Sequence, residues 1–363
     1  MSNLPRIDRL VEILVKKGLE HIMIGPSSDM EYLTKIAPII DERFKVLVIS
    51  KNGKNFAIAP QICKDEFEEE LLPDIPVYLW GDDTGPAAAI DMAFGEHGLS
   101  DVTVALNDGI RAIDVLSMQK KYQLKLVDGD ELVSILRRAK SPEEIERQKA
   151  VGALADEVLC EIENFIRPGL REYDIWLKLR DEFERRGGGK ISGIFASGPN
   201  GAMPHYTKYD RVIEKNDLMV VDFGGTYRGY RSDTTRTFVI GEPTEEQRKV
   251  YEVVLKAQKA GEAFVKPGIR ACDLDRTVRG VIEEAGYGSY FTHRTGHGIG
   301  IIAHEPPYIT ATETTTLQEG MTFSIEPGIY LPGKFGVRIE NCVVVTKDGC
   351  EAFTHYPREL RVI

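Results

Sequence analysis

The first 140 residues alternate between helical and strand-like hydrophobic patterns. Apolar residues spaced three and four apart form one face of a predicted helix: Ile7, Leu10, Val11, Leu14 and Val15. Short runs rich in β-branched residues predict strands at residues 44–49, 77–80 and 102–106. This alternation is typical of a small α/β domain with a mostly parallel sheet. No glycine-rich phosphate loop follows these strands, so nucleotide binding has little support here.

A helix start signal near residue 140 indicates a second domain. Ser141 and Glu144 form a capping box, and Pro142 occupies the first helical position between them. The predicted helix continues to a Pro-Gly pair at 168–169, which stops it. We therefore divide the chain into an amino-terminal α/β domain, residues 1–138, and a second domain, residues 139–363.

The second domain contains an internal repeat. The segment at 165–175 reappears at 264–274, with its Pro-Gly pair, one arginine, one aspartate and the apolar pattern retained. Each copy follows a capped helix, because Thr244 and Gln247 form a second capping box. Two halves of similar design are the simplest interpretation.

Two predicted hairpins in this domain each carry a pair of carboxylates. In the first, strands at 218–224 and 231–239 flank a turn, and a centre between Tyr227 and Arg228 would place Asp222 directly opposite Asp233. The second hairpin flanks a loop at 332–334 and would place Glu326 opposite Glu340. Facing carboxylates inside apolar strands destabilise a sheet unless cations compensate them. Two divalent metal ions would balance these four charges.

Histidines near the carboxylates add candidate ligands and proton donors. His297 lies between two glycines, where the backbone can approach a ligand closely, and His304 follows seven residues later. His205 lies in a Gly/Pro-rich loop upstream of the first hairpin. Because these histidines accompany the carboxylate pattern, a functional role is favoured over that of isolated surface residues.

Composition and charge exclude several other classes of function. Lys and Arg number 46 against 57 Asp and Glu, a net charge of −11 in 363 residues, and basic residues do not cluster, so no nucleic-acid partner is expected. Five cysteines without a CxxC pair suit free thiols in a reducing compartment. With no signal-peptide core and no run of about 18 apolar residues, we expect a cytoplasmic protein without membrane association.

These motifs resemble the pita-bread dinuclear metallopeptidases, a family that includes prolidase, aminopeptidase P, methionine aminopeptidase and creatinase. The resemblance rests on VDFG at 221–224, SDTTRT at 232–237, TGHGIG at 295–300, SIEPG at 324–328 and RIEN at 338–341. It covers residues 140–363, and the preceding domain resembles that of the prolidase, aminopeptidase P and creatinase branches. The resemblance implies an α/β amino-terminal domain followed by an α+β pita-bread catalytic domain with an internal pseudo-two-fold repeat.

The resemblance also implies the site residues. Five positions match metal ligands: Asp222, Asp233, His297, Glu326 and Glu340. The resemblance implies that Asp233 and Glu340 bridge the two ions. The ions would be Mn, Co, Zn or Fe, since this hard donor set disfavours copper and does not choose among the others. The implied catalytic residues are Glu326 as proton shuttle, His205 and His304 as partners of the substrate and transition state, and Arg338. By strand parity Arg338 shares a face with Glu340, and Thr235 shares one with Asp233 as its expected partner.

The implied activity is hydrolysis of Xaa-Pro bonds at peptide amino termini by a hydroxide shared between the two metals. Small peptides with proline in second position are the expected substrates, and Xaa-Pro dipeptidase is the leading interpretation. Xaa-Pro aminopeptidase on longer peptides stays open, because many prolidases carry a carboxylate-binding arginine shortly after the His-Glu-Pro segment, where this chain has Tyr308.

Methionine aminopeptidase and a non-catalytic interaction module are further alternatives. The first usually lacks such an amino-terminal domain, and the second would have lost ligands. Because related prolidases pair, the resemblance also predicts a homodimer.

Overall fold

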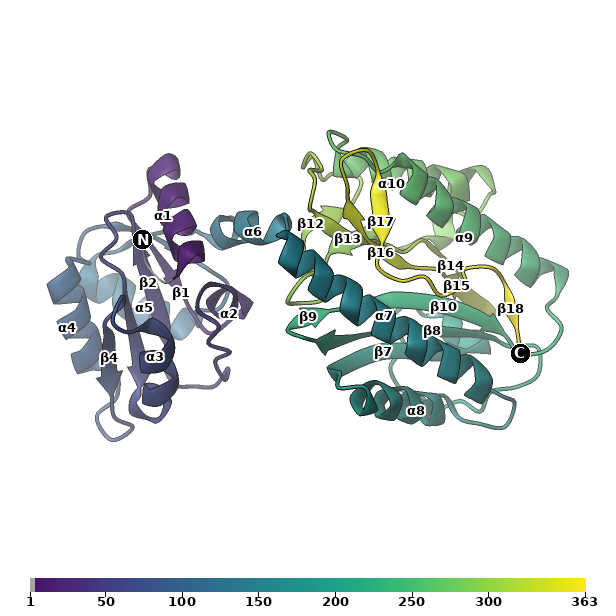
Figure 1. Ribbon diagram of the computed structural model, residues 1–363, viewed down its shortest axis with the longest axis horizontal. Coiled ribbons are helices and arrows are strands. Elements are labelled where there is room, and N and C mark those ends of the chain that lie inside the picture. The colour runs from purple at the N-terminus through teal and green to yellow at the C-terminus, as the bar shows by residue number, and fades with distance from the viewer. Residues whose placement is uncertain (1–3) are drawn as a thin grey trace. The chain divides into compact units, whose positions relative to one another are not determined.

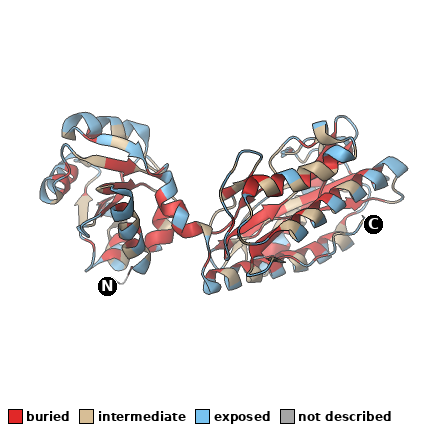
Figure 2. Ribbon diagram, turned by 90° about the horizontal axis from the view of Figure 1, so that it is seen from above, coloured by how far each residue is buried: buried red, intermediate tan, exposed pale blue. Residues whose placement is uncertain are grey.

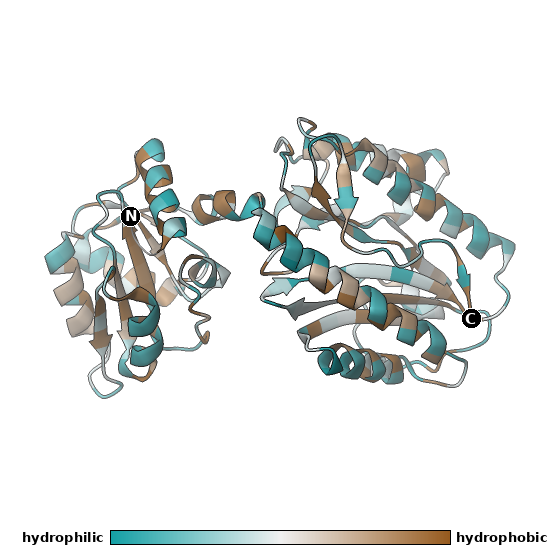
Figure 3. Cartoon of the chain, in the orientation of Figure 1, coloured by the Kyte–Doolittle hydropathy of each residue, from teal (hydrophilic) through white to brown (hydrophobic). Residues whose placement is uncertain are grey.

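The chain divides between Arg137 and Arg138 into two units, each with a hydrophobic core of its own. The structure is a computed structural model that describes residues 4–363 (Figure 1). In both units the strands are largely buried, whereas the helices keep one exposed face (Figure 2). Hydropathy follows the same division, with apolar strands and alternating stripes along the helices (Figure 3). None of the helices within the described residues is long and apolar enough to cross a membrane.

The first unit is built around a six-stranded sheet in the order β4-β3-β2-β1-β5-β6. The sheet is mixed: β1, β5 and β6 run parallel to one another, β3 runs parallel to β4, and β2 is antiparallel to both its neighbours. Its elements are α1 Pro5–Lys17, β1 His21–Ile24, α2 Ser28–Thr34, β2 Val46–Ser50, β3 Phe56–Pro60, α3 Lys64–Leu71, β4 Val77–Trp80, α4 Ala87–His97, β5 Thr103–Leu106, α5 Ala112–Tyr122, β6 Lys125–Asp128 and α6 Asp130–Arg138.

The predicted α/β class of this unit is confirmed. The helix predicted from residue 7 forms as α1, and the three predicted strands form as β2, β4 and β5. Sequence analysis missed β1, β3 and β6. Strand β6 is mostly exposed, so it lacks the hydrophobic run on which the prediction of strands relies.

The second unit combines four long helices with two curved sheets. The sheets have the orders β18-β10-β8-β7 and β12-β11-β13-β16-β17, and β14 pairs with β15 separately. Its elements are α7 Pro142–Phe165, α8 Glu172–Arg185, β7 Gly189–Ser197, β8 Leu218–Tyr227, β9 Tyr230–Arg231, β10 Thr234–Val239, α9 Glu245–Phe264, α10 Ala271–Glu284, β11 Gly296–Gly298, β12 Glu305–Ile309, β13 Thr322–Ile325, β14 Gly328–Leu331, β15 Phe335–Arg338, β16 Asn341–Val345, β17 Cys350–Ala352 and β18 Arg361–Val362.

Both predicted capping boxes form and set the start of the two longest helices. Ser141 accepts a hydrogen bond from the backbone N–H of Glu144, whose side chain bonds back to the backbone N–H of Ser141. Thr244 and Gln247 make the same reciprocal pair at the start of α9. Each box satisfies two backbone donors that a helix start otherwise leaves unpaired.

The internal repeat is visible in the backbone after each long helix. Gly169 and Gly268 adopt almost the same left-handed conformation, with φ of 92° and 91°. Their N–H groups donate to the carbonyl oxygens of Ile213 and Leu317, each at 2.9 Å. Because α8 and α10 then begin in equivalent places, the two halves of the unit repeat one design, as the sequence predicts.

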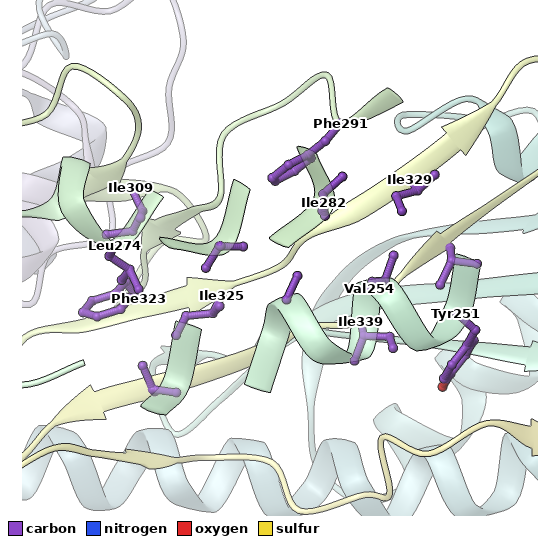
Figure 4. Close-up of a cluster of buried hydrophobic side chains, with 14 of the residues drawn as sticks. Tyr251, Val254, Leu274, Ile282, Phe291, Ile309, Phe323, Ile325, Ile329 and Ile339 are labelled. Carbon is purple, nitrogen blue, oxygen red and sulfur yellow. The ribbon is translucent and has the colours of Figure 1, made fainter. Parts of the chain in front are cut away.

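Each half packs its helix pair against its own strands. The core of the first half joins α7 and α8 to β7, β8 and β10. The core of the second half joins α9 and α10 to β13 and β14, and Val254 from α9 lies beside Ile339 in it (Figure 4). The helices therefore cover the apolar faces of the strands, and the opposite faces remain available for polar side chains.

The helix α7 lies so close to the carboxyl-terminal segment that one position tolerates no side chain. A Cβ added to Gly152 would lie 2.3 Å from the carbonyl oxygen of Phe353. We expect Gly152→Ala to lower the free energy of unfolding by about 1–3 kcal/mol, because backbone must shift. The matched control is Gly280→Ala in α10, where no atom lies within 4 Å of the new Cβ, and a gain of about 0.4–1 kcal/mol is expected. Urea denaturation measures both, and equal stabilities would contradict the prediction.

Candidate metal centre

Five predicted site residues reach one cavity from strand ends of both halves. The cavity has a volume of about 700 Å³ and is lined by polar and charged side chains. Asp222 lies within β8 and His297 within β11. Asp233 directly precedes β10, Glu326 directly follows β13, and Glu340 lies between β15 and β16. The two halves meet at this point, where the backbone N–H of Glu340 donates to the carbonyl of Thr235 at 3.1 Å.

The ligating atoms of these residues form overlapping groups. In each group, one atom from each member lies within 4.8 Å of the others: Asp222 with Asp233 and Glu340, and His297 with Glu326 and Glu340. Nε2 of His297 lies 3.2 Å from Oε1 of Glu326 and 3.7 Å from Oδ2 of Asp233. Glu340 belongs to both groups and therefore links them.

Glycines on both sides of His297 allow this strand to enter the site. A Cβ at Gly296 would lie 1.9 Å from the carbonyl oxygen of Ser324, and one at Gly298 would lie 2.5 Å from that of Glu305. Strand β11 thus fits between β12 and β13 only because these positions carry no side chain. The backbone N–H of His297 donates to Oγ of Ser324 at 2.9 Å, which fixes the histidine in place.

The predicted register of the first hairpin is wrong. Asp222 lies opposite Thr235, not opposite Asp233. The turn is formed by Arg228 and Gly229, both with positive φ (51° and 80°), so its centre lies one residue later than predicted. The residue opposite Asp222 is therefore two positions later than predicted. A shift of two positions keeps side chains on the same face of the sheet, so both aspartates still enter the cavity.

The second hairpin has the predicted register. Strand β13 pairs with β16, where Ile325 lies opposite Asn341, and β14 pairs with β15, where Gly328 lies opposite Arg338. Both pairings follow the register that places Glu326 across from Glu340. Both glutamates lie at the break between these two ladders. Their side chains are thereby free to point into the cavity.

Crowding of buried carboxylates shifts their pKa values. Burial, reinforced by the charge of Asp222, raises the pKa of Asp233 to about 7. Burial and the charges of Asp233 and Glu326 raise the pKa of Glu340 well above its usual value. Burial also acts on Glu326, but the hydrogen bond and charge of His297 outweigh it and lower its pKa to about 2. Without a cation, therefore, part of the site is protonated at neutral pH.

One buried oxygen indicates what the site is built to hold. Oε2 of Glu340 accepts a hydrogen bond from Oγ1 of Thr235 at 2.7 Å. Its Oε1 is buried and has no hydrogen-bond partner among residues 4–363. A buried carboxylate oxygen left without a partner is costly. Divalent cations would satisfy it, and a donor set of carboxylate oxygens and one imidazole suits Mn, Fe, Co or Zn.

Arg338 supplies the positive charge nearest to the carboxylates. Its guanidinium forms a buried ion pair with Asp222 and donates to the Tyr330 hydroxyl at 2.6 Å. The predicted face of Arg338 is therefore right. The predicted partner of Thr235 is wrong, because Thr235 bonds Glu340 and not Asp233. Strand parity gives the face of a residue, but the partner depends on the approach of the other half.

Sequence reasoning missed two residues of this hydrogen-bonded chain. Nε2 of His293 lies 2.8 Å from the Tyr330 hydroxyl, which connects His293 through Tyr330 to Arg338. His293 lies four residues before His297 and lines the same cavity. Tyr330 lies four residues after Glu326, on β14, which pairs with β15, and this proximity in sequence was the signal available for it.

The other two predicted histidines lie at the open side of the cavity. His205 and His304 are exposed and line the cavity with the five candidate ligands. The ring of His304 lies 4.1 Å from that of His297, centroid to centroid. Although the residue is exposed, its ring is partly covered by the cavity wall, and this partial burial and the charge of His297 lower the pKa of His304 to about 4, so its imidazole is neutral at pH 7.

The fold and this site define a metallopeptidase. Residues 146–347 match the profile of metallopeptidase family M24, and residues 6–139 match the creatinase/prolidase amino-terminal domain. The chain belongs to the M24 family.

Its relatives carry dipeptidase names. A protein named probable dipeptidase PepE of Mycobacterium tuberculosis is 35% identical over 350 residues, 95% of this chain and 92% of the relative. An Xaa-Pro dipeptidase of Pyrococcus horikoshii is 32% identical over 367 residues, 98% of each chain. The solved prolidase of Thermococcus sibiricus is 36% identical, with a TM-score of 0.93 over the full length of both chains.

The pKa shifts predict that metal stabilises this protein more strongly at higher pH. The pKa values of Asp233 and Glu340 are raised in the folded protein, so these carboxyls lose their protons at lower pH in the unfolded chain than in the folded one. The metal-free fold therefore loses stability as pH rises from about 4 through 7. A metal ion displaces these protons, so it stabilises the fold most where they are already lost. Melting temperatures with and without saturating Mn²⁺ should differ more at about pH 7.5 than at about pH 5.5.

The control is Asp233→Asn, which removes one of the two titrating groups. Its metal-induced shift should be smaller and less dependent on pH. A wild-type shift that is equal or larger at the lower pH would contradict the prediction.

Proposed function

We propose that this chain is a metal-dependent exopeptidase that hydrolyses Xaa-Pro bonds at peptide amino termini, as an Xaa-Pro dipeptidase. The observation that carries the proposal is the cavity wall in which four carboxylates and His297 converge from both halves of an M24 fold. Relatives named Xaa-Pro dipeptidase that span the whole chain support the bond specificity. Small peptides with proline in second position are the proposed substrates.

Two divalent ions are the proposed cofactors. Asp222, Asp233, His297, Glu326 and Glu340 would hold them. The membership of Glu340 in two ligand groups and its unpartnered buried oxygen support this role. Bound there, ions such as Mn, Co, Zn or Fe activate a water molecule and polarise the scissile carbonyl.

The remaining chemistry belongs to side chains of the protein. Glu326 is the proposed base that takes the proton of the attacking water and passes it to the leaving nitrogen. Oγ of Ser324 donates to its carboxylate at 2.9 Å. His205 and His304 are proposed to donate hydrogen bonds to the oxygen that becomes negative during attack.

Arg338 is proposed to position the site. Its ion pair with Asp222 and its bond to Tyr330 fix the orientation of that carboxylate. The positive charge also offsets part of the repulsion among the carboxylates.

Composition and analogy support proposals for the compartment, the oligomeric state and the partners of the protein. The five cysteines are free thiols, which supports a reducing compartment, and we propose the cytoplasm. We propose a homodimer by analogy with two-fold oligomers in general and prolidases in particular. A nucleic-acid partner is not proposed, because the net charge is −11.

Metal-dependent cleavage tests the proposed function. We expect the Mn²⁺-loaded protein to hydrolyse Xaa-Pro, to lose activity after exhaustive chelation, and to regain it when metal is restored. The matched substrates are Xaa-Ala, Met-Ala-Xaa and Xaa-Pro-Yaa-Zaa, which separate a dipeptidase from methionine and Xaa-Pro aminopeptidases. Undiminished activity in protein with confirmed zero metal content would refute the mechanism, and preference for Met-Ala-Xaa would refute the specificity.

Light scattering tests the proposed dimer. The expected mass is twice the 40.6 kDa of the chain at micromolar concentration. A fully active species of 40.6 kDa would reject the dimer.

A further inference from the structure

One buried carboxylate of the second unit lies outside the lining of the metal-site cavity. Glu172 is the first residue of α8 and is fully buried. Its Oε1 accepts hydrogen bonds from the backbone N–H and Oγ of Ser197, at 2.6 and 2.9 Å. Nδ2 of Asn200 lies 3.1 Å from each carboxylate oxygen, and the backbone N–H of Arg211 donates to Oε2 at 3.2 Å. Several such donors are what a buried carboxylate requires.

These donors belong to the two ends of one loop, residues 197–211. Ser197 is the last residue of β7 and Asn200 lies in the short turn that follows it, whereas Arg211 closes the loop at its other end. Two further bonds join the ends: Nη1 of Arg211 donates to Oγ of Ser197 at 3.0 Å, and the backbone N–H of Glu172 donates to the carbonyl of Arg211 at 3.0 Å. Glu172 thus holds both ends of the loop from the start of a helix.

The middle of this loop carries His205 into the cavity. The His205 imidazole forms no hydrogen bond with any of residues 4–363. His293, on another wall of the cavity, has partners at both ring nitrogens. The place of the His205 ring therefore depends on the backbone of its loop.

That backbone lies directly against the strand that carries Arg338. A Cβ added to Gly336 of β15 would lie 1.9 Å from the carbonyl oxygen of Gly201. The carbonyl oxygen of Pro204, next to His205, accepts a hydrogen bond from Nη1 of Arg338 at 3.4 Å. Because the fit is so close, a loop end that moves must also move His205 relative to the candidate metal ligands.

We propose that Glu172 is a positioning residue of this enzyme: by closing loop 197–211 it holds His205 where the imidazole can donate to the reacting oxygen. This inference rests on the role of His205 in the proposed function. Glu172 lies outside the cavity lining, so its effect on turnover passes through His205.

The test variant is Glu172→Gln, which keeps the shape of the side chain. Its amide nitrogen replaces an acceptor, so one of the two loop ends loses its bond. On an Xaa-Pro dipeptide, the Mn²⁺-loaded variant should lose about 10- to 100-fold in kcat, because a displaced His205 no longer stabilises the developing charge. KM should stay within about 3-fold of wild type, because that charge develops only in the transition state.

A double-mutant cycle separates positioning from general damage to the enzyme. In a His205→Ala background, Glu172→Gln should change kcat by less than about 3-fold, because the group it positions is already absent. Asn200→Ala removes one donor from the same carboxylate and is a milder variant. It should lower kcat about 3- to 10-fold, and this loss should also vanish in the His205→Ala background.

The matched control is Glu182→Gln on the same helix. Glu182 is also buried, but it pairs with Lys178 and Arg185 at 2.7 and 2.6 Å, and it lies outside the cavity lining. Its kcat should stay within about 2-fold of wild type.

Hydrogen exchange followed by mass spectrometry gives a readout independent of turnover. Glu172→Gln should raise deuterium uptake in peptides that cover loop 197–211 and leave α7 and α9 unchanged, since only a local closure is lost. Glu182→Gln should leave uptake in that loop as in wild type.

Unchanged loop exchange in Glu172→Gln, or an undiminished loss of kcat in the His205→Ala background, would overturn the inference and leave the proposed function intact. Failure of the metal-loaded wild type to cleave Xaa-Pro, with the loop exchange still raised by Glu172→Gln, would overturn the proposed function and leave only the closure of the loop.

Discussion

The constraint on which the site depends is the repulsion among four carboxylates in one buried cavity. Burial, together with the charge of Asp222, raises the pKa of Asp233 to about 7, which indicates how unfavourable ionisation is there without cations. The fold tolerates this cost because each half brings its carboxylates on strand ends anchored by a separate helix-backed core. Repulsion at the centre is thus opposed by packing on both sides of it.

The same constraint explains why almost every carboxylate has a dedicated neighbour. Arg338 pairs with Asp222, Ser324 bonds Glu326, and Thr235 bonds one oxygen of Glu340. These contacts fix the orientation of the oxygens before any cation binds, so binding a cation does not have to order them. The remaining oxygen of Glu340 is left for the cation, at the point where the two halves meet.

Local signals in the sequence were sufficient for the class of fold and most of the cavity. Capping boxes, the Pro-Gly repeat and strand parity identified α7, α9 and the faces of Asp222 and Glu340, since each depends on neighbours close in sequence. The centre of the first turn was misplaced because Arg228 adopts positive φ, which its residue type does not signal. The partner of Thr235 could not be predicted, because it is contributed by the other half of the domain.

The three cavity arginines also differ in what their surroundings leave them free to do. Arg338 forms an ion pair with Asp222, whereas Arg231 donates from Nη1 to backbone and hydroxyl oxygens and keeps a buried Nε without a hydrogen-bond partner among residues 4–363. Arg294 is held by an aromatic face, which orients a guanidinium without neutralising its charge. Sequence alone presents three similar arginines, and only their contacts in the folded chain distinguish an ion pair, a set of backbone and hydroxyl hydrogen bonds, and a stacked aromatic ring.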